Sequence, residues 1–561
     1  MARSLVTLVN PNFVYPPITP YALDILTTSL EADGFDVEVV DLTFRREDWE
    51  RCLREYFATR DPLLVGVTVR NTDTIYAQQQ RVFIDTHRDV VNAIKDHTSA
   101  PIVAGGVGFS SMPFALTDYF DIPYGVKGPG EHIMVRLART LLAGGRTDDI
   151  PGLLINHGEG RVRQVLPYPA RIRQGRPPDT LATGAGVVNT STVYLRRSAT
   201  PYKVDNVRYY RTGGLGNILT KNGCVYACSH CVEPDAKGTQ FTRREVAVVV
   251  DEIEALTDQG IFDIHTTDSE FNLAIAHTKA VLTEIVRRKS ADPATSLHQL
   301  RLWVYVQPTP FDDELAALLA EAGCGGINLA PDHVRDDVLD GWKVTGKGRR
   351  YYTFDDAHRV CSLARERDIP TMVEVLLGMP GETEATLREC VKRTLDLDAT
   401  VTGYSLGIRA FPYSPLGIQL ARECGGTRTV RGLQSTTALE PIVLTPKGAC
   451  STVEYERQFM FDQHGRFRPV YFLSPELPED RATVESPSGR WAKSIDLLHD
   501  LVPEDDLHRV MLPTLPGLTQ DDNNYADNPF LLRLIELGYT GAFWSHWPHR
   551  AEIMRDMVTT R

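Results

Sequence analysis

Two series of short aliphatic runs, each alternating with amphipathic helical segments, limit the fold of this chain more than any other feature. In residues 1–145 the segments between the runs, such as 21–32 and 131–142, carry apolar residues on one helical face. The pattern predicts an α/β domain of the doubly wound, Rossmann-like kind, in which ligands bind beyond the carboxyl ends of the strands. Five runs read as its buried parallel strands: SLVTLVNPN, FDVEVVDL, PLLVGVTVR, PIVAGGVG and DIPYGVKG.

The second series follows a stretch without periodicity. Residues 146–212 are rich in Pro, Gly, Thr and Arg and are predicted to connect two domains. Six βα units then predict a full or partial TIM-like (β/α)6 barrel over residues 213–435, with its chemistry at the carboxyl ends of the strands. Its predicted strands are GNILT, FDIHTTD, RLWVYVQP, GGINLAPD, TMVEVLLGMPG and VTGYSLGIRAF, and its predicted helices include 243–257, 312–322 and 355–367. Residues 436–561, with the aromatic run GAFWSHWPH, are predicted to form a small α+β C-terminal cap that helps to shape the substrate pocket.

The charge and cysteine content exclude several classes of partner. The net charge is −13, from 60 Lys and Arg against 73 Asp and Glu, and such a surface repels nucleic acid and anionic lipid. No apolar run reaches the roughly 18 to 20 residues that a bilayer requires. Nine cysteines, an odd number, follow no signal peptide, so we expect a protein of the reducing cytoplasm.

Three of the cysteines are concentrated in the stretch NGCVYACSHC. Cys224, Cys228 and Cys231 have the spacing C-x3-C-x2-C, whereas a structural zinc site requires four ligands, commonly as two C-x2-C pairs. Three thiolates suit a 4Fe-4S cluster that keeps one iron open to a ligand such as S-adenosylmethionine. The alternative is three unrelated buried thiols. We predict that these three cysteines hold the cluster.

With this loop directly after the first barrel strand, residues 213–435 resemble the radical S-adenosylmethionine superfamily. In that family the residue before the last cysteine is usually aromatic, and here it is His230. GMPGET, at residues 378–383, resembles the glycine-rich end of a late barrel strand in the same family. The resemblance therefore implies that Gly378 contacts the cofactor.

The order of the domains resembles the cobalamin-dependent methyltransferase branch of that superfamily. There, the segment that begins VNPN and the turn AGGVGFSSMP line a corrinoid, and glycines let the backbone approach this large flat ligand. The turn KGPGEH would complete the site. The chain contains no D-x-H-x-x-G motif, so no histidine is expected below the cobalt. The implied cofactor-binding residues are Asn10, Pro11, Asn12, Gly105, Gly106, Gly108, Gly128 and Glu131.

Arg70 is the candidate for the lower face of the cobalamin, because it follows the strand PLLVGVTV. A guanidinium remains protonated and has no lone pair to give a metal, so it would cover the cobalt without coordinating it. The alternative is an arginine at a strand end that pairs with a carboxylate.

Two barrel positions complete the predicted site. Glu270 follows the second barrel strand, where the superfamily places polar residues against the methionine part of S-adenosylmethionine. In RLWVYVQP, the alternation of side chains points Trp303, Tyr305 and Gln307 into the barrel. Tyr305 is thus a candidate general base, and the alternative is an ordinary core tyrosine.

Arg70, Glu270 and Tyr305 together resemble a branch of the family that methylates C2 of L-tryptophan on the way to the quinaldic acid of thiopeptide antibiotics. This resemblance implies transfer of a methyl group from S-adenosylmethionine through methylcobalamin to an sp2 carbon, with a flavodoxin or ferredoxin as electron donor. One alternative is a radical enzyme that releases 5′-deoxyadenosine and methylates or rearranges an unactivated sp3 carbon of another small molecule or peptide. Another is a non-enzymatic corrinoid and iron–sulfur sensor.

Overall fold

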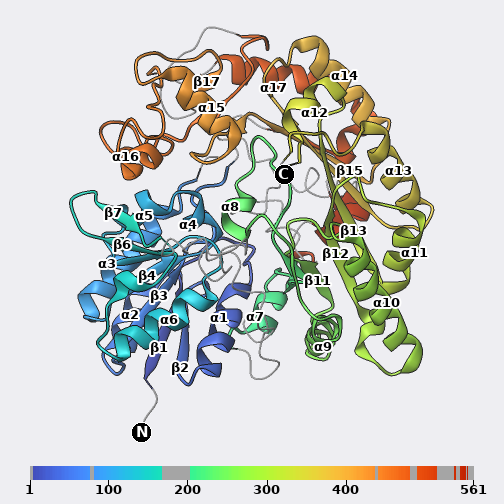
Figure 1. Ribbon diagram of the computed structural model, residues 1–561. Coiled ribbons are helices and arrows are strands. Elements are labelled where there is room, and N and C mark those ends of the chain that lie inside the picture. The colour runs from blue at the N-terminus through green and yellow to red at the C-terminus, as the bar shows by residue number, and fades with distance from the viewer. Residues whose placement is uncertain are drawn as a thin grey trace, which may run out of the picture.

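Two seven-stranded sheets with their helices make up most of the molecule (Figure 1). The computed structural model describes residues 4–75, 77, 81–166, 203–345, 347–435, 440–479, 489–513, 536–538, 544–550 and 552–553. No helix among these residues combines the length and the apolar character that a membrane span requires.

The first sheet is the predicted Rossmann-like domain. Its strand order is β2-β1-β3-β4-β5-β6-β7, and the first five of these are parallel. The strands are β1 (Leu5–Asn10), β2 (Asp36–Asp41), β3 (Leu64–Thr68), β4 (Ile102–Gly105), β5 (Tyr124–Val126), β6 (Leu153–Asn156) and β7 (Val162–Gln164). The five predicted strands are confirmed. β6 and β7 add an antiparallel hairpin, so the sheet continues past residue 145 into the predicted connector.

Helices cover both faces of this sheet. The helices are α1 (Tyr21–Ala32), α2 (Trp49–Phe57), α3 (Ile84–His97), α4 (Val107–Ser111), α5 (Pro113–Tyr119) and α6 (Glu131–Leu142). α1 packs beside α6, and α2 packs beside α3, in two separate hydrophobic cores. The strand ends that carry the predicted corrinoid residues therefore lie at one edge of a doubly wound sheet.

The second sheet is an open barrel of parallel strands in the order β19-β15-β14-β13-β12-β11-β8. Its strands are β8 (Gly216–Ile218), β11 (Asp263–Thr266), β12 (Arg301–Val306), β13 (Cys324–Asp332), β14 (Thr371–Leu377), β15 (Val401–Leu406) and β19 (Val510–Met511). The six predicted strands and the three predicted helices are confirmed. The outer helices are α9 (Val246–Thr257), α10 (Ile275–Ala291), α11 (Asp313–Ala322), α12 (Asp336–Trp342), α13 (Phe354–Arg365) and α14 (Glu384–Leu395).

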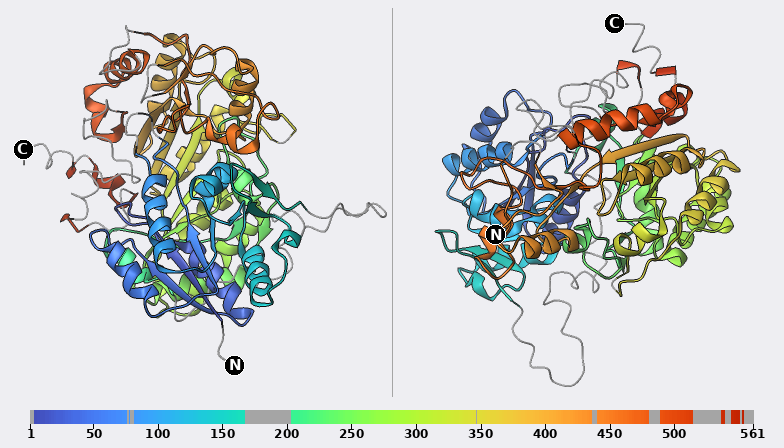
Figure 2. Two further views of the ribbon diagram at one scale, coloured as in Figure 1. Left: turned by 90° about the vertical axis from the view of Figure 1, so that its left-hand side faces the viewer. Right: turned by 90° about the horizontal axis from the view of Figure 1, so that it is seen from above.

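The cap contains residues from before and after the boundary predicted at residue 435. A small sheet in the order β16-β18-β17 joins β16 (Ile408–Arg409), β17 (Leu433–Gln434) and β18 (Tyr471–Phe472). Its helices are α15 (Pro415–Cys424) and α16 (Thr452–Arg457), and α17 (Gly489–Leu501) lies farther along the chain. The cap shares one hydrophobic core with α2, α3 and α5 of the first domain. Figure 2 shows it lying against both large sheets.

The described part of the aromatic run, η7 (Trp544–His549), lies against the inner face of the barrel. The ring of Trp547 meets that of Trp303 edge-on, with centroids 5.7 Å apart. Gly326 of β13 leaves the room for both rings, since a Cβ at this position would lie 2.6 Å from Trp303 and 3.0 Å from Trp547. The C-terminal segment thus helps to fill the barrel interior. Residues 541–543 of the run, and 167–202 of the connector, are outside the described residues.

Candidate active site at the junction of the two sheets

The cysteine loop leaves the barrel after the short strand β9 (Lys221–Asn222) and ends at α8 (Glu233–Lys237). Its backbone is fixed by hydrogen bonds from Ala227 N to Val344 O at 2.9 Å and from Ser229 N to Trp342 O at 3.0 Å. The loop is therefore held against the segment that follows α12. The three cysteines are thus attached to a backbone whose conformation is fixed by these hydrogen bonds.

The three cysteines have the character of cluster ligands. Cys224 and Cys228 are each 8% exposed, and Cys231 is partly buried. Burial raises the pKa of all three thiols, that of Cys224 to about 12, so that a nearby positive charge is needed to hold them as thiolates. Iron supplies such a charge.

The loop carries three cysteines, one ligand fewer than a closed structural zinc site. Among the residues that the structure describes, no three His, Cys, Asp or Glu side chains converge on a point that suits a single metal ion. Three thiolates that bind three different irons of a cubane have no need to converge. Three thiols on one short loop therefore fit the predicted 4Fe-4S cluster, which needs three ligands and leaves one iron open.

A chain of polar side chains connects the loop to Glu270. Tyr351 Oη lies 3.6 Å from Cys228 Sγ and donates to Gln307 Oε1 at 3.1 Å, and Gln307 Nε2 donates to Glu270 Oε1. The ring of Tyr351 is stacked on that of Tyr226, with centroids 3.7 Å apart. Glu270 Oε2 is buried with no hydrogen-bond partner among the described residues. Burial raises the pKa of Glu270 to about 7. An unpartnered carboxylate oxygen beside the loop suits a cationic group such as the ammonium of S-adenosylmethionine.

A buried ion pair also lies beside the loop, next to Val344. Lys343 Nζ is 2.9 Å from Asp332 Oδ2, and both side chains are almost fully buried. The imidazole of His230 lies 3.9 Å from the same carboxylate and is stacked on Trp342. Burial holds the pKa of His230 at about 4, so this ring is neutral. Asp332 ends the predicted strand GGINLAPD, and this position indicates a site residue because the chemistry of such a barrel lies at the carboxyl ends of its strands. The sequence has no comparable signal for Lys343.

The ring of Tyr305 lies against that of His265, and the positive charge of Arg70 acts on the same imidazole. The rings of Tyr305 and His265 meet edge-on, with centroids 5.3 Å apart. Burial, with the positive charges of Lys237 and Arg70, lowers the pKa of His265 to about 3. Arg70 also donates to Asn71 Oδ1 at 3.0 Å. Nothing in the sequence distinguishes His265 as a site residue, although it lies in the predicted strand FDIHTTD.

Tyr305 points into the barrel, as predicted. Leu302 and Val304 lie in the core between the sheet and its outer helices, whereas Trp303 and Tyr305 belong to a separate inner cluster. This confirms the alternation of β12.

Two predicted corrinoid glycines pack against protein backbone. Gly106 has a φ of +113°, and a Cβ there would lie 2.5 Å from Val69 O. A Cβ on Gly108 would lie 2.7 Å from Arg70 O. These glycines thus let α4 approach the end of β3 and the backbone of Arg70, while Gly105 ends β4 beside them. Contact of the three glycines with a corrinoid remains a prediction.

Asn10 is part of an internal polar network. Its Nδ2 lies 3.0 Å from Asp41 Oδ1, 3.0 Å from Thr43 Oγ1 and 3.1 Å from Tyr209 Oη. These bonds tie β1 to β2 and to α7 (Asn206–Arg211). Pro11 is buried beside it, and Asn12 accepts a hydrogen bond from Val14 N at 3.1 Å. A role of residues 10–12 in binding the corrinoid also stays a prediction.

The turn after β5 joins the first domain to the cysteine loop. Lys127 Nζ lies 2.6 Å from Asp235 Oδ1 of α8, and Gly128 N donates to Ser110 Oγ at 2.9 Å. Gly128, with a φ of +81°, lies beside the backbone of α8. The predicted corrinoid edge therefore directly adjoins the helix that follows the cluster cysteines.

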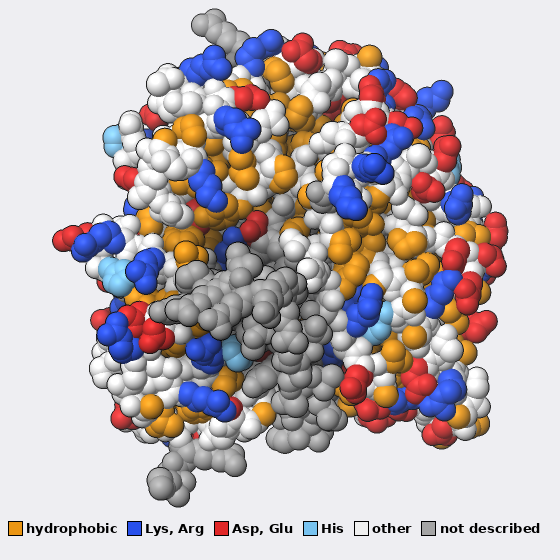
Figure 3. All heavy atoms as spheres, viewed as in Figure 1, with side chains coloured by type: hydrophobic (Ala, Val, Ile, Leu, Met, Phe, Trp, Pro, Cys, Tyr) orange, Lys and Arg blue, Asp and Glu red, His pale blue; other side chains and the backbone are white. Residues whose placement is uncertain are grey.

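Exposed apolar side chains and a buried acid suit a large ligand at this edge. Ile75, Val107 and Val225 are 43%, 41% and 40% exposed, and they follow β3, begin α4 and lie in the cysteine loop. Glu131 Oε2 is buried without a partner among the described residues, and burial raises the pKa of Glu131 to about 7. Figure 3 shows hydrophobic side chains gathered where the cap and the two sheets meet. These features fit cobalamin, whose bulk would cover apolar side chains and whose amides would satisfy a buried acid.

Gly378 lies where the glycine-rich turn was predicted, directly after β14. It has a φ of +93°, and its N–H donates to Glu382. Glu382 also accepts from His333 Nε2 at 3.2 Å, and both side chains are fully buried. The turn is therefore braced internally, and contact of Gly378 with S-adenosylmethionine remains a prediction.

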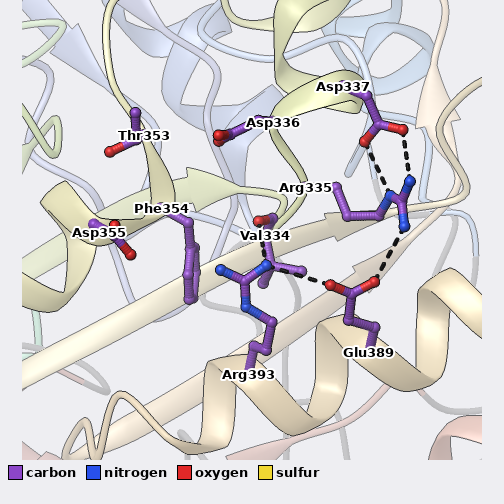
Figure 4. A pocket seen from close by; sticks show the side chains of 9 residues that line it. All are labelled: Val334, Arg335, Asp336, Asp337, Thr353, Phe354, Asp355, Glu389 and Arg393. Atoms are coloured by element: carbon purple, nitrogen blue, oxygen red, sulfur yellow. Dashed lines mark hydrogen bonds and ion pairs between the residues drawn. The ribbon is translucent and has the colours of Figure 1, made fainter.

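A surface hollow of about 360 Å³ lies apart from these residues (Figure 4). Four of its charged groups pair with one another: Arg335 lies 2.6 Å from Asp337, and Glu389 lies 3.2 Å from Arg335 and 3.3 Å from Arg393. We interpret it as a solvent-exposed ion-pair network. The lining residues are Val334, Arg335, Asp336, Asp337, Thr353, Phe354, Asp355, Glu389 and Arg393.

Two family models match the chain. The Radical SAM superfamily matches residues 218–394, and the B12 binding domain matches residues 12–138. These ranges fall on the barrel with its cysteine loop and on the first sheet.

Relatives match nearly the full length. Tryptophan 2-C-methyltransferase from Streptomyces laurentii is 56% identical, over 99% of this chain and 97% of that protein. The structure of the radical S-adenosylmethionine methyltransferase TsrM from Kitasatospora setae, with cobalamin and a 4Fe-4S cluster bound, is 58% identical and superposes with a TM-score of 0.92 over 100% of both chains. The same enzyme with tryptophan and the analogue aza-SAM bound is 58% identical, with a TM-score of 0.90 over 99% of both chains.

Proposed function

We propose that this chain, which belongs to the cobalamin-dependent radical S-adenosylmethionine methyltransferases, transfers a methyl group from S-adenosylmethionine to C2 of L-tryptophan. The observation that carries the proposal is identity above one half along the whole chain with a tryptophan 2-C-methyltransferase and with a methyltransferase that binds tryptophan. The placement of Tyr305 against His265 inside the barrel supports it. We further propose that the product serves natural-product biosynthesis.

Each cofactor has a set of residues that would hold it. Cys224, Cys228 and Cys231 would bind the 4Fe-4S cluster, and Glu270 would pair with the ammonium group of S-adenosylmethionine. The edge from Val107 to Glu131 would hold cobalamin. When bound, the cluster supplies an iron that anchors S-adenosylmethionine, and cobalamin supplies a cobalt that accepts and gives up the methyl group.

The protein groups around the cofactors have separate tasks. Arg70 would cover the lower face of the corrin without coordination, because a guanidinium has no lone pair to offer. Tyr305 Oη, as the phenolate, would accept the hydrogen bond of the indole N–H and take its proton as C2 gains the methyl group. Loss of the C2 hydrogen as a proton, with return of a proton to the ring nitrogen, would then restore the indole. His265, neutral because of its burial, packs against the ring of Tyr305 and so limits its orientation.

The decisive experiment is anaerobic reconstitution with iron, sulfide and methylcobalamin, followed by incubation with S-adenosylmethionine and tryptophan. We expect tryptophan to gain the mass of one methyl group, with S-adenosylhomocysteine as coproduct. Unchanged tryptophan, while another small molecule is methylated, would refute the substrate. Stoichiometric release of 5′-deoxyadenosine would refute the polar route and favour the radical alternative.

An electron donor and a compartment complete the proposal. A small protein of the flavodoxin or ferredoxin type would keep the loaded enzyme reduced. All nine cysteines lie among the described residues and are free thiols, which supports the cytoplasm as the compartment.

A further inference from the structure

A buried arginine of the cap reaches across to the first domain. Arg409, in β16, is 5% exposed, and its Nη2 lies 3.2 Å from Oδ2 of Asp73, which is fully buried. The two residues are 336 positions apart in the sequence. The cap is therefore joined by an ion pair to the segment that follows β3.

The guanidinium itself is rigidly held. Its Nη1 lies 2.8 Å from Ala410 O, 3.0 Å from Phe459 O and 3.1 Å from Val470 O. It also lies over the ring of Phe411, 4.9 Å from the centroid. Arg409 thus presents its remaining N–H groups to Asp73 from a fixed position in the cap.

Asp73 in turn shapes the backbone just beyond Arg70. Its Oδ1 accepts a hydrogen bond from Ile75 N at 2.8 Å, and its Oδ2 accepts one from Thr72 Oγ1 at 3.2 Å. Ile75 has a φ of +55°, which is a strained conformation for a β-branched residue. The ion pair and these bonds together hold the turn three residues after Arg70.

α4 packs against the same stretch of backbone, through the close approaches of Gly106 and Gly108 to residues 69–71. We propose that Arg409 is a positioning residue for Arg70: through Asp73 it fixes the turn that holds the Arg70 guanidinium at the lower face of the corrin. This inference rests on the proposed function, which places Arg70 below the cobalt. The cap therefore takes part in setting the axial environment of the metal.

The test uses the full-length protein loaded with its cluster and with cob(II)alamin, whose electron paramagnetic resonance spectrum reports the axial ligand. Three variants are compared. D73N keeps an oxygen for Ile75 N but removes the charge, R409K keeps the charge but loses the planar fork, and R70A removes the guanidinium itself. The matched control is E252Q, which alters the buried Arg244–Glu252 pair, 2.6 Å apart, at the edge of the barrel.

We expect D73N and R409K to shift the spectrum toward that of R70A, and the double variant R70A/D73N to match R70A alone. Hydrogen exchange of the amides of residues 70–75, measured on the protein without cobalamin, should be roughly 10-fold faster in D73N and R409K, with no change in E252Q. Wild-type spectra and exchange in D73N and R409K would overturn the inference. A second outcome would also overturn the inference: D73N and R409K exchange faster, but only R70A has an altered spectrum. The role of Arg70 would then remain intact. An unchanged spectrum in R70A would instead refute the placement of Arg70, and the role of Arg409 with it.

Discussion

The phenol of Tyr351 donates a hydrogen bond to Oε1 of Gln307 at 3.1 Å, and this contact sets the orientation of the Gln307 amide. The amide nitrogen therefore faces Glu270, to which it donates. Glu270 is thus held at the end of a polar chain that begins at Cys228, with one carboxylate oxygen left for a ligand.

The raised pKa of Glu270 predicts a pH-dependent affinity for S-adenosylmethionine. Below about pH 7 the carboxyl is protonated, and above it the carboxylate can pair with the ammonium of the ligand. We expect the affinity, measured by calorimetry on the cluster-loaded enzyme, to rise from about pH 6 to about pH 8. E270Q should bind S-adenosylmethionine more weakly, and its affinity should no longer rise over this pH range. An identical pH profile in E270Q would rule out Glu270 as the partner of the ammonium.

Removal of any one cluster cysteine should abolish the cluster. C224A, C228A and C231A are expected to fall from about four bound iron atoms to fewer than about one after reconstitution, with loss of methylation. Iron and sulfide assays measure this. The control is C361A, because Cys361 is a buried cysteine in α13, within the barrel core. If C361A lost as much iron as the three cluster variants, the loss would be due to impaired folding and not to a missing ligand.

Removal of the Tyr305 hydroxyl should slow methyl transfer while tryptophan still binds. Y305F keeps the ring that packs on His265, so we expect a fall in kcat of about 100- to 10,000-fold, the range for loss of a general base. Y404F is the control, since the Tyr404 hydroxyl bonds to Thr394 at 2.6 Å beneath the outer helices. It should cost about 1 kcal/mol of stability and leave kcat unchanged. A wild-type kcat in Y305F would exclude Tyr305 as the base.

Glu456 should make the attachment of the cap sensitive to pH. Its carboxylate accepts hydrogen bonds from Ala115 N, at 2.8 Å, and from Tyr413 Oη, and burial raises its pKa to about 8. The stability that the protonated carboxyl contributes is fully present below about pH 4.5 and is lost as the pH rises through about 8.

Thermal unfolding from about pH 4.5 to about pH 9 tests this expectation. E456Q should flatten the loss of Tm between about pH 4.5 and about pH 8, whereas E456A should lose about 1–3 kcal/mol of stability because it leaves two buried donors unsatisfied. A wild-type loss of Tm in E456Q would assign the pH dependence to another group.

Local patterns in the sequence predicted most elements of the fold. The alternation of RLWVYVQP placed Tyr305 inside the barrel, because neighbouring side chains of a strand must point to opposite faces. Aliphatic runs that end in Gly, Asn or Asp indicated the parallel strands, because such strands are buried on both faces and are therefore apolar along their whole length. The cysteine spacing identified the loop, since thiolate ligands of one cluster lie close together in the chain.

Contacts between distant segments could not be predicted in this way. The Arg409–Asp73 pair, the hydrogen bond from Tyr351 to Gln307 and the packing of Trp547 on Trp303 join residues that no local period relates. Contacts of this kind also extend the first sheet by β6 and β7. They likewise pair β17, before residue 435, with β18 after it.

The sequence by itself thus determined the strands, the cluster loop and the side of the barrel that Tyr305 faces, because those follow from backbone periodicity and ligand spacing. Only the tertiary structure decided which side chains surround Cys228, Arg70 and Glu270. Burial in the assembled molecule selects those partners, since a buried charge or donor is stable only where folding brings it a counterpart.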